Sequence, residues 1–222
     1  MRQRKPHPVA RGYGWLTERL YNELAWAYDP VSWIGSLGQA AAVRKWALDY
    51  LAGSRVLEVG FGTGELLLEM ARRDLQVVGL DCSPAMHHQA GLKLRRHGLR
   101  VPLVRGVAQQ MPFAVNAFDS IVATFPAGYI FDRATWLEAA RLLKVPSPLT
   151  GGCPGRFIVV GLCASSAGRR LPSVSRFLFG LPLEEMLAHF ELSAPEIGLD
   201  LQVQMRRHAG LEIPIMVAEK RD

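Results

Sequence analysis

Residues 56–65 read Val-Leu-Glu-Val-Gly-Phe-Gly-Thr-Gly-Glu, a buried-strand pattern that runs through three alternate glycines into a helical segment. Glycine has no Cβ and tolerates positive φ, so a turn built on Gly60, Gly62 and Gly64 lets a ligand approach the backbone closely. A dinucleotide fingerprint needs its third glycine at the sixth position of this turn. That position is Glu65, whose carboxylate would lie beside two phosphates at a helix N-terminus. The spacing therefore disfavours a pyrophosphate ligand and, with it, a nicotinamide oxidoreductase.

Two acidic residues accompany the glycine turn. Glu58 lies on the strand just before it, where a carboxylate suits a ligand that carries a positive ammonium group. Asp81 ends the next predicted strand, residues 76–81, where a carboxylate can accept hydrogen bonds from both hydroxyls of a ribose. An ammonium group and a ribose together describe S-adenosylmethionine. The alternatives are that Glu58 caps a nearby helix and that the glycines form an ordinary tight connection between a strand and a helix.

The order Glu-x-Gly-x-Gly-x-Gly at 58–64, followed by Gly-Leu-Asp-Cys-Ser at 79–83, resembles the first two motifs of the class I S-adenosylmethionine-dependent methyltransferases. The resemblance implies an α/β, Rossmann-like, doubly wound and mostly parallel seven-stranded sheet with an antiparallel C-terminal hairpin. It also implies methyl transfer as the activity and S-adenosyl-L-methionine as the cofactor. The residues expected to contact this cofactor are Glu58, Gly60, Phe61, Gly62, Thr63, Gly64, Asp81, Cys82, Val107, Ala108, Gln109 and Thr124.

Length and composition favour a single domain. A chain of 222 residues with 49% hydrophobic content buries one good core and is short for two. We expect residues 1–52 to form an N-terminal helical cap on a methyltransferase core of residues 53–222. The three cysteines are an odd set without Cys-x-x-Cys spacing, which favours a reducing cytoplasm over a disulfide framework or a zinc site.

The chain alternates predicted strands with predicted helices, a pattern that builds a parallel sheet. A last pair of strand-like segments, 199–207 and 211–219, is joined by a three-residue link and predicts an antiparallel hairpin at the sheet edge. The other strands are expected at 55–60, 76–81, 101–106, 118–125 and 155–162, and the helices at 15–28, 39–51, 63–73, 83–98, 133–144 and 183–190.

A further segment bears on the adenine. Residues 106–113 read Gly-Val-Ala-Gln-Gln-Met-Pro-Phe and resemble the family pattern Gly-Asp-Ala-Glu-x-Leu-Pro-Phe, whose aspartate commonly meets the adenine amino group. Val107 replaces that aspartate. We expect backbone groups near Val107 and Ala108 to hold the adenine, with Gln109 as a neutral substitute and with Cys82 and Met111 against the ring. The missing carboxylate should weaken binding by no more than roughly 1–3 kcal/mol.

Three tyrosines are candidates for the acceptor side of the site. Residues 21–29 resemble the Tyr-Asp-x-x-Ala-x-x-Tyr-Asp opening of the small-molecule branch that includes quinone C-methyltransferases and phospholipid N-methyltransferases, where this helix closes over the cofactor. Tyr21 and Tyr28 lie seven residues apart on one helical face, so both can point at the site or both can simply pack in an amphipathic cap. Tyr129, with Phe125, forms either an apolar or cation-π wall for an amine or part of the core.

No general base stands out in the sequence. Methyl transfer from a sulfonium is an in-line displacement with a good neutral leaving group, so the protein mainly positions the reactants and excludes water. The histidines at 87, 88, 189 and 208 are expected as surface or capped residues rather than as catalysts. An amine acceptor with an available lone pair needs no base.

Charge and hydropathy limit the classes of partner that the chain is expected to bind. The net charge is +6, but the basic residues are scattered without interleaved aromatics, which disfavours a nucleic-acid methyltransferase. The sequence contains no run of about 18 apolar residues, the length that would indicate a membrane-spanning helix. Apolar residues in the cap and in 171–183, flanked by arginines, favour an apolar or lipid-like acceptor and peripheral contact with an anionic membrane surface. A non-catalytic protein that binds S-adenosylmethionine stays open as an alternative, as do the methylated atom and the oligomeric state.

Overall fold

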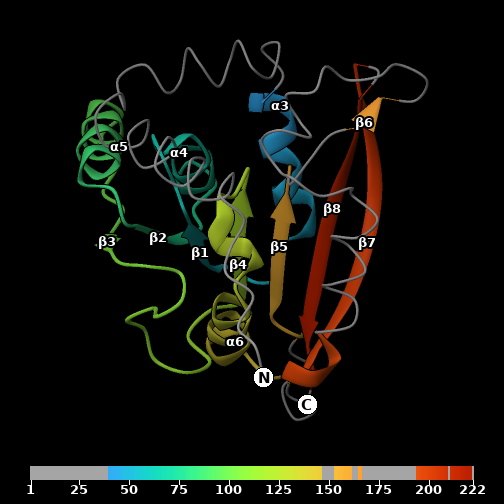
Figure 1. Cartoon of the computed structure of the whole chain (residues 1–222). Coiled ribbons are helices and arrows are strands. Elements are labelled where there is room, and N and C mark those ends of the chain that lie inside the picture. Colours follow the sequence, from blue (N-terminus) through green and yellow to red (C-terminus); the bar gives the residue numbers. More distant parts are fainter. Residues whose placement is uncertain (1–39, 147–152, 162–164, 167–193, 210, 222) are drawn as a thin grey trace, which may run out of the picture.

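The computed structural model describes residues 40–146, 153–161, 165–166, 194–209 and 211–221. These residues build one mixed sheet flanked by helices (Figure 1). The strands are β1 (Arg55–Val59), β2 (Gln76–Asp81), β3 (Leu103–Arg105), β4 (Ser120–Thr124), β5 (Arg156–Val160), β6 (Ser165–Ser166), β7 (Leu199–His208) and β8 (Leu211–Lys220). The helices are α3 (Ala40–Lys45), α4 (Glu65–Ala71), α5 (Pro84–Arg96) and α6 (Arg133–Leu142), with 3₁₀ turns η1 (Trp46–Tyr50), η2 (Gly128–Phe131) and η3 (Pro195–Ile197).

The strand order is β3-β2-β1-β4-β5-β8-β6, and β7 pairs with β8. Strands β1 to β5 run parallel, whereas β8 is antiparallel to both β5 and β7, as Figure 1 shows from β3 on the left to β7 on the right. The predicted fold class is confirmed; the two-residue β6 beside β8 is an addition to the seven expected strands. Because β1 lies between β2 and β4, the chain reverses its direction across the sheet here, and ligands bind outside the carboxyl ends of strands at such a point.

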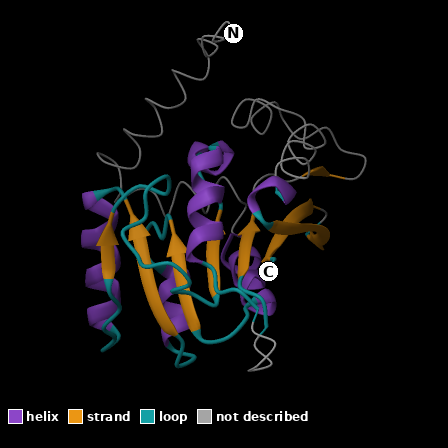
Figure 2. Cartoon of the chain, turned by 90° about the horizontal axis from the view of Figure 1, so that it is seen from below, coloured by secondary structure: helices purple, strands orange, loops and turns teal. Residues whose placement is uncertain are grey.

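The alternation of side chains along each strand gives the sheet two buried faces. Leu57, Ile121 and Phe157 pack with α6 on one face. Val56 and Val122 pack with α3, η1, α4 and α5 on the other. Figure 2 shows helices beside the row of strands. By the same alternation Glu58, two residues after Val56, belongs to the face that α3 and α4 cover.

Helix boundaries follow local signals in the sequence. The side chain of Ser83 accepts a hydrogen bond from the amide of Met86 (3.4 Å) and Pro84 occupies the first helical position, so α5 begins where expected. It ends just before Gly98, whose φ is +70°. Asp132 caps α6 by accepting from the amide of Ala134 (3.0 Å).

Apart from element ends that shift by one or two residues, three details of the secondary structure differ from the prediction. The helix expected over 39–51 is an α-helix followed by a 3₁₀ turn, and the third strand is only three residues long. The hairpin link was predicted one residue too long, because His208 pairs with Leu211 and leaves two residues between the strands. Ala209 has a φ of +48°, as primed two-residue hairpin turns require. The predicted helices 15–28 and 183–190 lie outside the described residues.

The longest described helix, α5, has 13 residues. Over the ranges that the structure describes, no helix has the length and apolar character to cross a bilayer.

Candidate functional site

The glycine turn after β1 has the backbone geometry that its sequence predicts. Gly60, Gly62 and Gly64 have φ values of +71°, +53° and +79°, a region that side chains with a Cβ rarely adopt. The amide of Gly60 donates to the carbonyl of Leu80 (2.7 Å), which ties the turn to the end of β2. A Cβ on Gly64 would lie 2.9 Å from that of Ala90, so this glycine also lets α4 approach α5 closely.

Asp81 lies at the end of β2, directly beside the glycine turn. Its side chain is 6% exposed, and its two oxygens accept hydrogen bonds from the amides of Gly62 and Ser83, both at 2.9 Å. Burial raises the pKa of Asp81, although these backbone hydrogen bonds oppose the shift. A carboxylate accepts up to about four hydrogen bonds, so Asp81 keeps acceptor capacity beyond its backbone partners, which also include Cys82.

Glu58 is the most unusual group in the described structure. It is 1% exposed, and its Oε2 atom has no hydrogen-bond partner among the described residues. Burial raises its pKa to about 8; the charge of Arg44 opposes the shift and Asp81 adds to it. A backbone hydrogen bond from Leu67, in the first turn of α4, also lowers the pKa. Glu58 therefore has a feature of each interpretation. Its carboxyl group contacts the start of a helix, as a cap would, and it still presents one unpartnered oxygen that a ligand could use.

The loop after β3 lies next to Asp81. The amide of Gly106 donates to the Asp81 carbonyl (3.2 Å), and Val107 and Gln110 form an isolated bridge that closes the loop. Val107 is 49% exposed, whereas Ala108 is buried. Met111, predicted against the adenine ring, is 2% exposed and packs in the core with Ala108.

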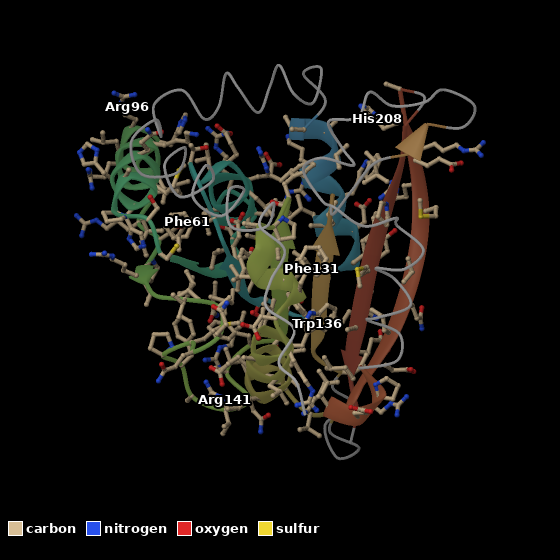
Figure 3. All side chains as sticks on the ribbon, in the orientation of Figure 1. Phe61, Arg96, Phe131, Trp136, Arg141 and His208 are labelled. Carbon is tan, nitrogen blue, oxygen red and sulfur yellow. The ribbon has the colours of Figure 1, made fainter. Side chains whose placement is uncertain are left out.

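The remaining predicted contacts differ in their exposure. Phe61 and Thr63 in the glycine turn are buried, as is Thr124 at the end of β4, while Cys82 is exposed and Gln109 is half-buried. In Figure 3, Phe61 lies near the strand ends between α5 and β4, and Arg141 of α6 lies at the opposite end of the sheet. The structure thus brings the first two motifs together at one edge.

Tyr129 lies directly over the glycine turn. Its hydroxyl donates to the carbonyl of Val59 (3.0 Å), and a Cβ on Gly60 would lie 2.6 Å from that hydroxyl oxygen. The ring also packs against the α6 side of the core. The other tyrosine candidates, Tyr21 and Tyr28, lie outside the described residues and stay predictions.

Three residues near the site were missed by the sequence reasoning. His87 lies with Nε2 3.0 Å from the Asp81 carbonyl oxygen and its ring edge-on to Phe61, at 5.0 Å between centroids. Arg105 donates from Nε to the carbonyl of Cys82 (3.3 Å). Arg44 of α3 acts electrostatically on Glu58. The position of His87, one turn into the helix that follows Asp81, was the signal that could have placed it.

Metal chemistry was not expected at this edge. Within the described ranges, no group of three or more histidine, cysteine or acidic residues is arranged to hold a metal ion. Cys82 and Cys153 are exposed free thiols, and Cys163 lies outside the described residues.

The residues at this edge fit the chemistry of S-adenosylmethionine. An unpartnered buried carboxylate oxygen on Glu58 suits an ammonium group, three glycines leave bare backbone beside it, and the buried carboxylate of Asp81 suits the ribose hydroxyls. All three features lie at the carboxyl ends of β1 and β2, where open α/β sheets bind ligands.

Comparisons with known proteins point to the methyltransferases. Residues 56–145 match the family described as "Methyltransferase domain". The ubiquinone/menaquinone biosynthesis C-methyltransferase of Geobacter sp. (strain M21) is 30% identical over 134 residues, which are 56% of this chain and 57% of that protein. The demethylmenaquinone methyltransferase of Tropheryma whipplei (strain Twist) is 33% identical over 157 residues, 68% of this chain and 60% of that protein. The chain thus spans a little over half the length of these curated relatives.

The magnesium protoporphyrin IX methyltransferase of Synechocystis PCC 6803, solved with bound S-adenosylmethionine, shares the fold. It superposes with a TM-score of 0.60 at 14% identity and covers 98% of this chain and 100% of its own. Residues 56–145 thus match a methyltransferase domain, the sequence resembles the quinone C-methyltransferases, and the fold is that of a class I S-adenosylmethionine-dependent methyltransferase.

Proposed function

We propose that this protein transfers the methyl group of S-adenosylmethionine to a small, apolar acceptor of the quinone type in its reduced, hydroquinone form, whose nucleophilic atom takes the methyl group and releases a proton to water. The observation that carries the proposal is the unpartnered, buried Oε2 of Glu58 beside a turn of three positive-φ glycines. The names of the two curated relatives, a ubiquinone/menaquinone biosynthesis C-methyltransferase and a demethylmenaquinone methyltransferase, support the acceptor class.

The chain's own groups would act mainly by binding and orientation. Glu58 would face the ammonium group, the backbone at Gly60 and Gly62 would lie along the methionine part, and Asp81 would accept hydrogen bonds from the ribose. The exposed Val107 and the backbone of its loop, which the Asp81 carbonyl fixes through Gly106, would border the adenine. Phe61 and Thr124 would complete this surface from the turn and from β4.

Bound S-adenosylmethionine supplies an electrophilic methyl group on a sulfonium with a neutral thioether as its leaving group. The rate then depends on how closely the acceptor is held in line with that methyl group and on exclusion of water. Tyr129 lies over Gly60 and is the described candidate for contact with the acceptor. Tyr21 and Tyr28 are proposed for the same role from the cap.

The test has two stages. Calorimetry with S-adenosylmethionine and with its demethylated product should give saturable binding at one site. Labelled-methyl transfer should then be measured with demethylated quinones kept reduced as hydroquinones, and with phospholipids, amines and RNA, as separate acceptor pools. Label in the quinone pool alone supports the proposal. Tight cofactor binding without transfer to any pool favours a non-catalytic binding protein, and label in RNA favours a nucleic-acid methyltransferase.

Peripheral contact with an anionic membrane is proposed for the route by which an apolar acceptor arrives. The residues behind it, the cap and 171–183, lie outside the described residues. Arginines at the described end of β7 are already neutralised, because Arg206 pairs with Asp49 (2.6 Å) and Arg207 pairs with Glu212. Co-sedimentation with anionic and with neutral vesicles tests the contact, and absence from both pellets would contradict it.

A further inference from the structure

We propose that Arg44 binds the carboxylate of the amino-acid end of S-adenosylmethionine while Glu58 binds its ammonium group, so that the two side chains form a clamp for a zwitterion. The inference rests on the proposed function, and it adds a contact from α3, an element that the family motifs in this sequence do not include.

The register of α3 directs Arg44 toward the sheet. Ala40 and Ala47 are buried and lie four residues before and three residues after the arginine, so Arg44 shares their face of the helical segment. Arg44 itself is half-buried. The neighbouring Lys45 points away and pairs with Glu69 of α4 at 3.2 Å. The two adjacent cations therefore differ in environment, and Arg44 is the one that faces the site.

Phe125 gives the guanidinium group a fixed support. The Arg44 Cζ atom lies 5.8 Å from the centre of the Phe125 ring, within the range of a cation-π contact. Phe125 has a φ of +48°, a costly conformation for a bulky residue, and its amide donates to the Val160 carbonyl (2.8 Å). Its ring lies so close to Gly161 that a Cβ there would be 2.5 Å from a ring carbon. The backbone strain and the close packing together hold the ring at the carboxyl end of β4.

This support lies on the same face of the sheet as Glu58. In the β1–β4 pairing Glu58 is opposite Val122, and Phe125 follows Val122 by three residues. Strand alternation places Val122 on the face that α3 covers, and Glu58 belongs to the same face. Arg44 and Glu58 thus approach the end of the same strand pair from the helix and from the sheet.

The two charged groups interact without touching. Arg44 is close enough for its charge to lower the pKa of Glu58, but no ion pair joins them and the Oε2 atom stays unpartnered in the described structure. Glu69 shows the contrast, because its carboxylate contacts both Lys45 and Arg73 directly. A free amino acid end carries a cation and an anion a few bonds apart, and it is complementary to a carboxylate and a guanidinium separated by a gap.

The experiment compares two ligands that differ only in this carboxylate. S-adenosylmethionine and decarboxylated S-adenosylmethionine both carry the ammonium and the sulfonium, and their affinities are measured by calorimetry on the full chain. The wild type should bind the first about 10- to 100-fold more tightly, the range that one charge-assisted bidentate contact supplies. Arg44→Gln should bring that ratio close to one by weakening S-adenosylmethionine binding alone. Arg44→Lys should restore part of it, and Lys45→Gln should leave it unchanged.

The outcomes separate the clamp from the proposed function. If Arg44→Gln weakens both ligands equally, or neither, the clamp is wrong and Arg44 is only a counter-ion or a packing residue. If the glutamine variant does not fold, Arg44→Lys, which keeps the charge and the aliphatic stem, is measured instead. A lower ratio of the two affinities than in the wild type then supports the clamp, and an unchanged ratio overturns it. If the wild type binds neither ligand, the proposed function itself fails; wild-type binding with an unchanged ratio in Arg44→Gln overturns the clamp alone.

Discussion

Carboxylates at the two ends of the central strands have opposite pKa shifts. At the amino ends, Asp119 accepts hydrogen bonds from the amides of Ser54 (3.1 Å) and Arg55 (2.8 Å) and forms an ion pair with Lys144. Burial alone would raise the pKa of Asp119, but these partners outweigh it and lower the pKa. At the carboxyl ends, burial dominates and raises the pKa of both Glu58 and Asp81.

The difference separates groups that stabilise the fold from groups that are ready for a ligand. A carboxylate that is already paired with a cation and with amides gains little from a further cation, whereas a buried carboxylate without an ion pair gains more. Perturbed acids of the second kind gather at functional sites. We therefore propose that the same sheet uses one end for cohesion and the other for binding, and the following substitutions test that division.

Glu58→Gln should have the largest effect, through the dependence of stability on pH. The folded-state pKa of Glu58, about 8, lies above its unfolded value of 4.5, so the folded state keeps a proton that the unfolded state loses. Wild-type stability should therefore fall as pH rises from about 4.5 to about 8, by up to about 5 kcal/mol. The glutamine variant should lack this loss. Urea unfolding at pH 5, 7 and 9 measures it.

The control for this experiment is Glu69→Gln. Glu69 lies in α4 near the same face, but its exposed carboxylate is paired with Lys45 and Arg73, which lower its pKa. Its substitution should leave the wild-type pH slope above neutrality in place. If the free energy of unfolding depended on pH in the same way for the wild type and Glu58→Gln, Glu58 would be charged in the folded state. The contrast between the carboxylates at the two ends of the strands would then be wrong.

Asp81→Asn should reduce cofactor affinity by about 30- to 100-fold, because a neutral amide replaces an anion that accepts from the ribose. The isosteric amide keeps one acceptor oxygen for Gly62 or Ser83 but turns its NH2 group toward the other amide, so the free energy of unfolding should also fall by about 1–2 kcal/mol. Calorimetry with the demethylated cofactor product gives the affinity. A well-folded variant with wild-type affinity would place the ribose elsewhere.

Asp119→Asn is the matched substitution at the amino end, and its effect should fall on stability alone. Loss of the ion pair with Lys144 and weaker acceptance from Ser54 and Arg55 should cost about 1–2 kcal/mol at neutral pH. Because the folded pKa of Asp119 is lowered, the wild type loses this contribution as pH falls through that pKa, and the two proteins should converge in acid. Cofactor affinity should be unchanged; a weaker affinity would show that the two ends are coupled.

Tyr129→Phe should have the smallest effect on the fold. It removes the hydrogen bond to the Val59 carbonyl but leaves the ring over Gly60, so we expect a loss of about 1 kcal/mol in the free energy of unfolding. Cofactor affinity should stay within a factor of three of the wild type. Thermal melts and calorimetry on one protein preparation decide both points, and a large loss of affinity would move Tyr129 from the acceptor side to the cofactor.

Local signals in the sequence predicted the fold well. Strand β2 has the bounds that its apolar pattern indicates, and α5 has the cap and the end that Ser83-Pro84 and Gly98 specify. The glycine turn was equally local, since three alternate glycines leave few other conformations. The split of the first described helix into α3 and η1 was not visible, because the apolar residues keep a helical spacing across both parts.

The sequence could predict only those candidate site residues whose position depends on their own segment of the chain. Glu58 and Asp81 were found because each ends a strand of a recognisable motif. The approach of Arg44 to Glu58 and to Phe125 joins three separate elements, and no spacing along the chain encodes it. The degree to which Glu58 lacks partners depends on tertiary burial in the same way.

If the ligand's ammonium group binds Glu58 as proposed, its binding also releases a proton. With a pKa of about 8 the group holds its proton at neutral pH, and an ammonium cation brought beside it favours the charged form. Saturation of the site near pH 7 therefore expels close to one hydrogen ion into the medium. Phosphate and Tris have different enthalpies of protonation, so the binding enthalpy measured in the two buffers would differ in proportion to the number of protons released. That number shows directly whether Glu58 loses its proton when the ligand binds.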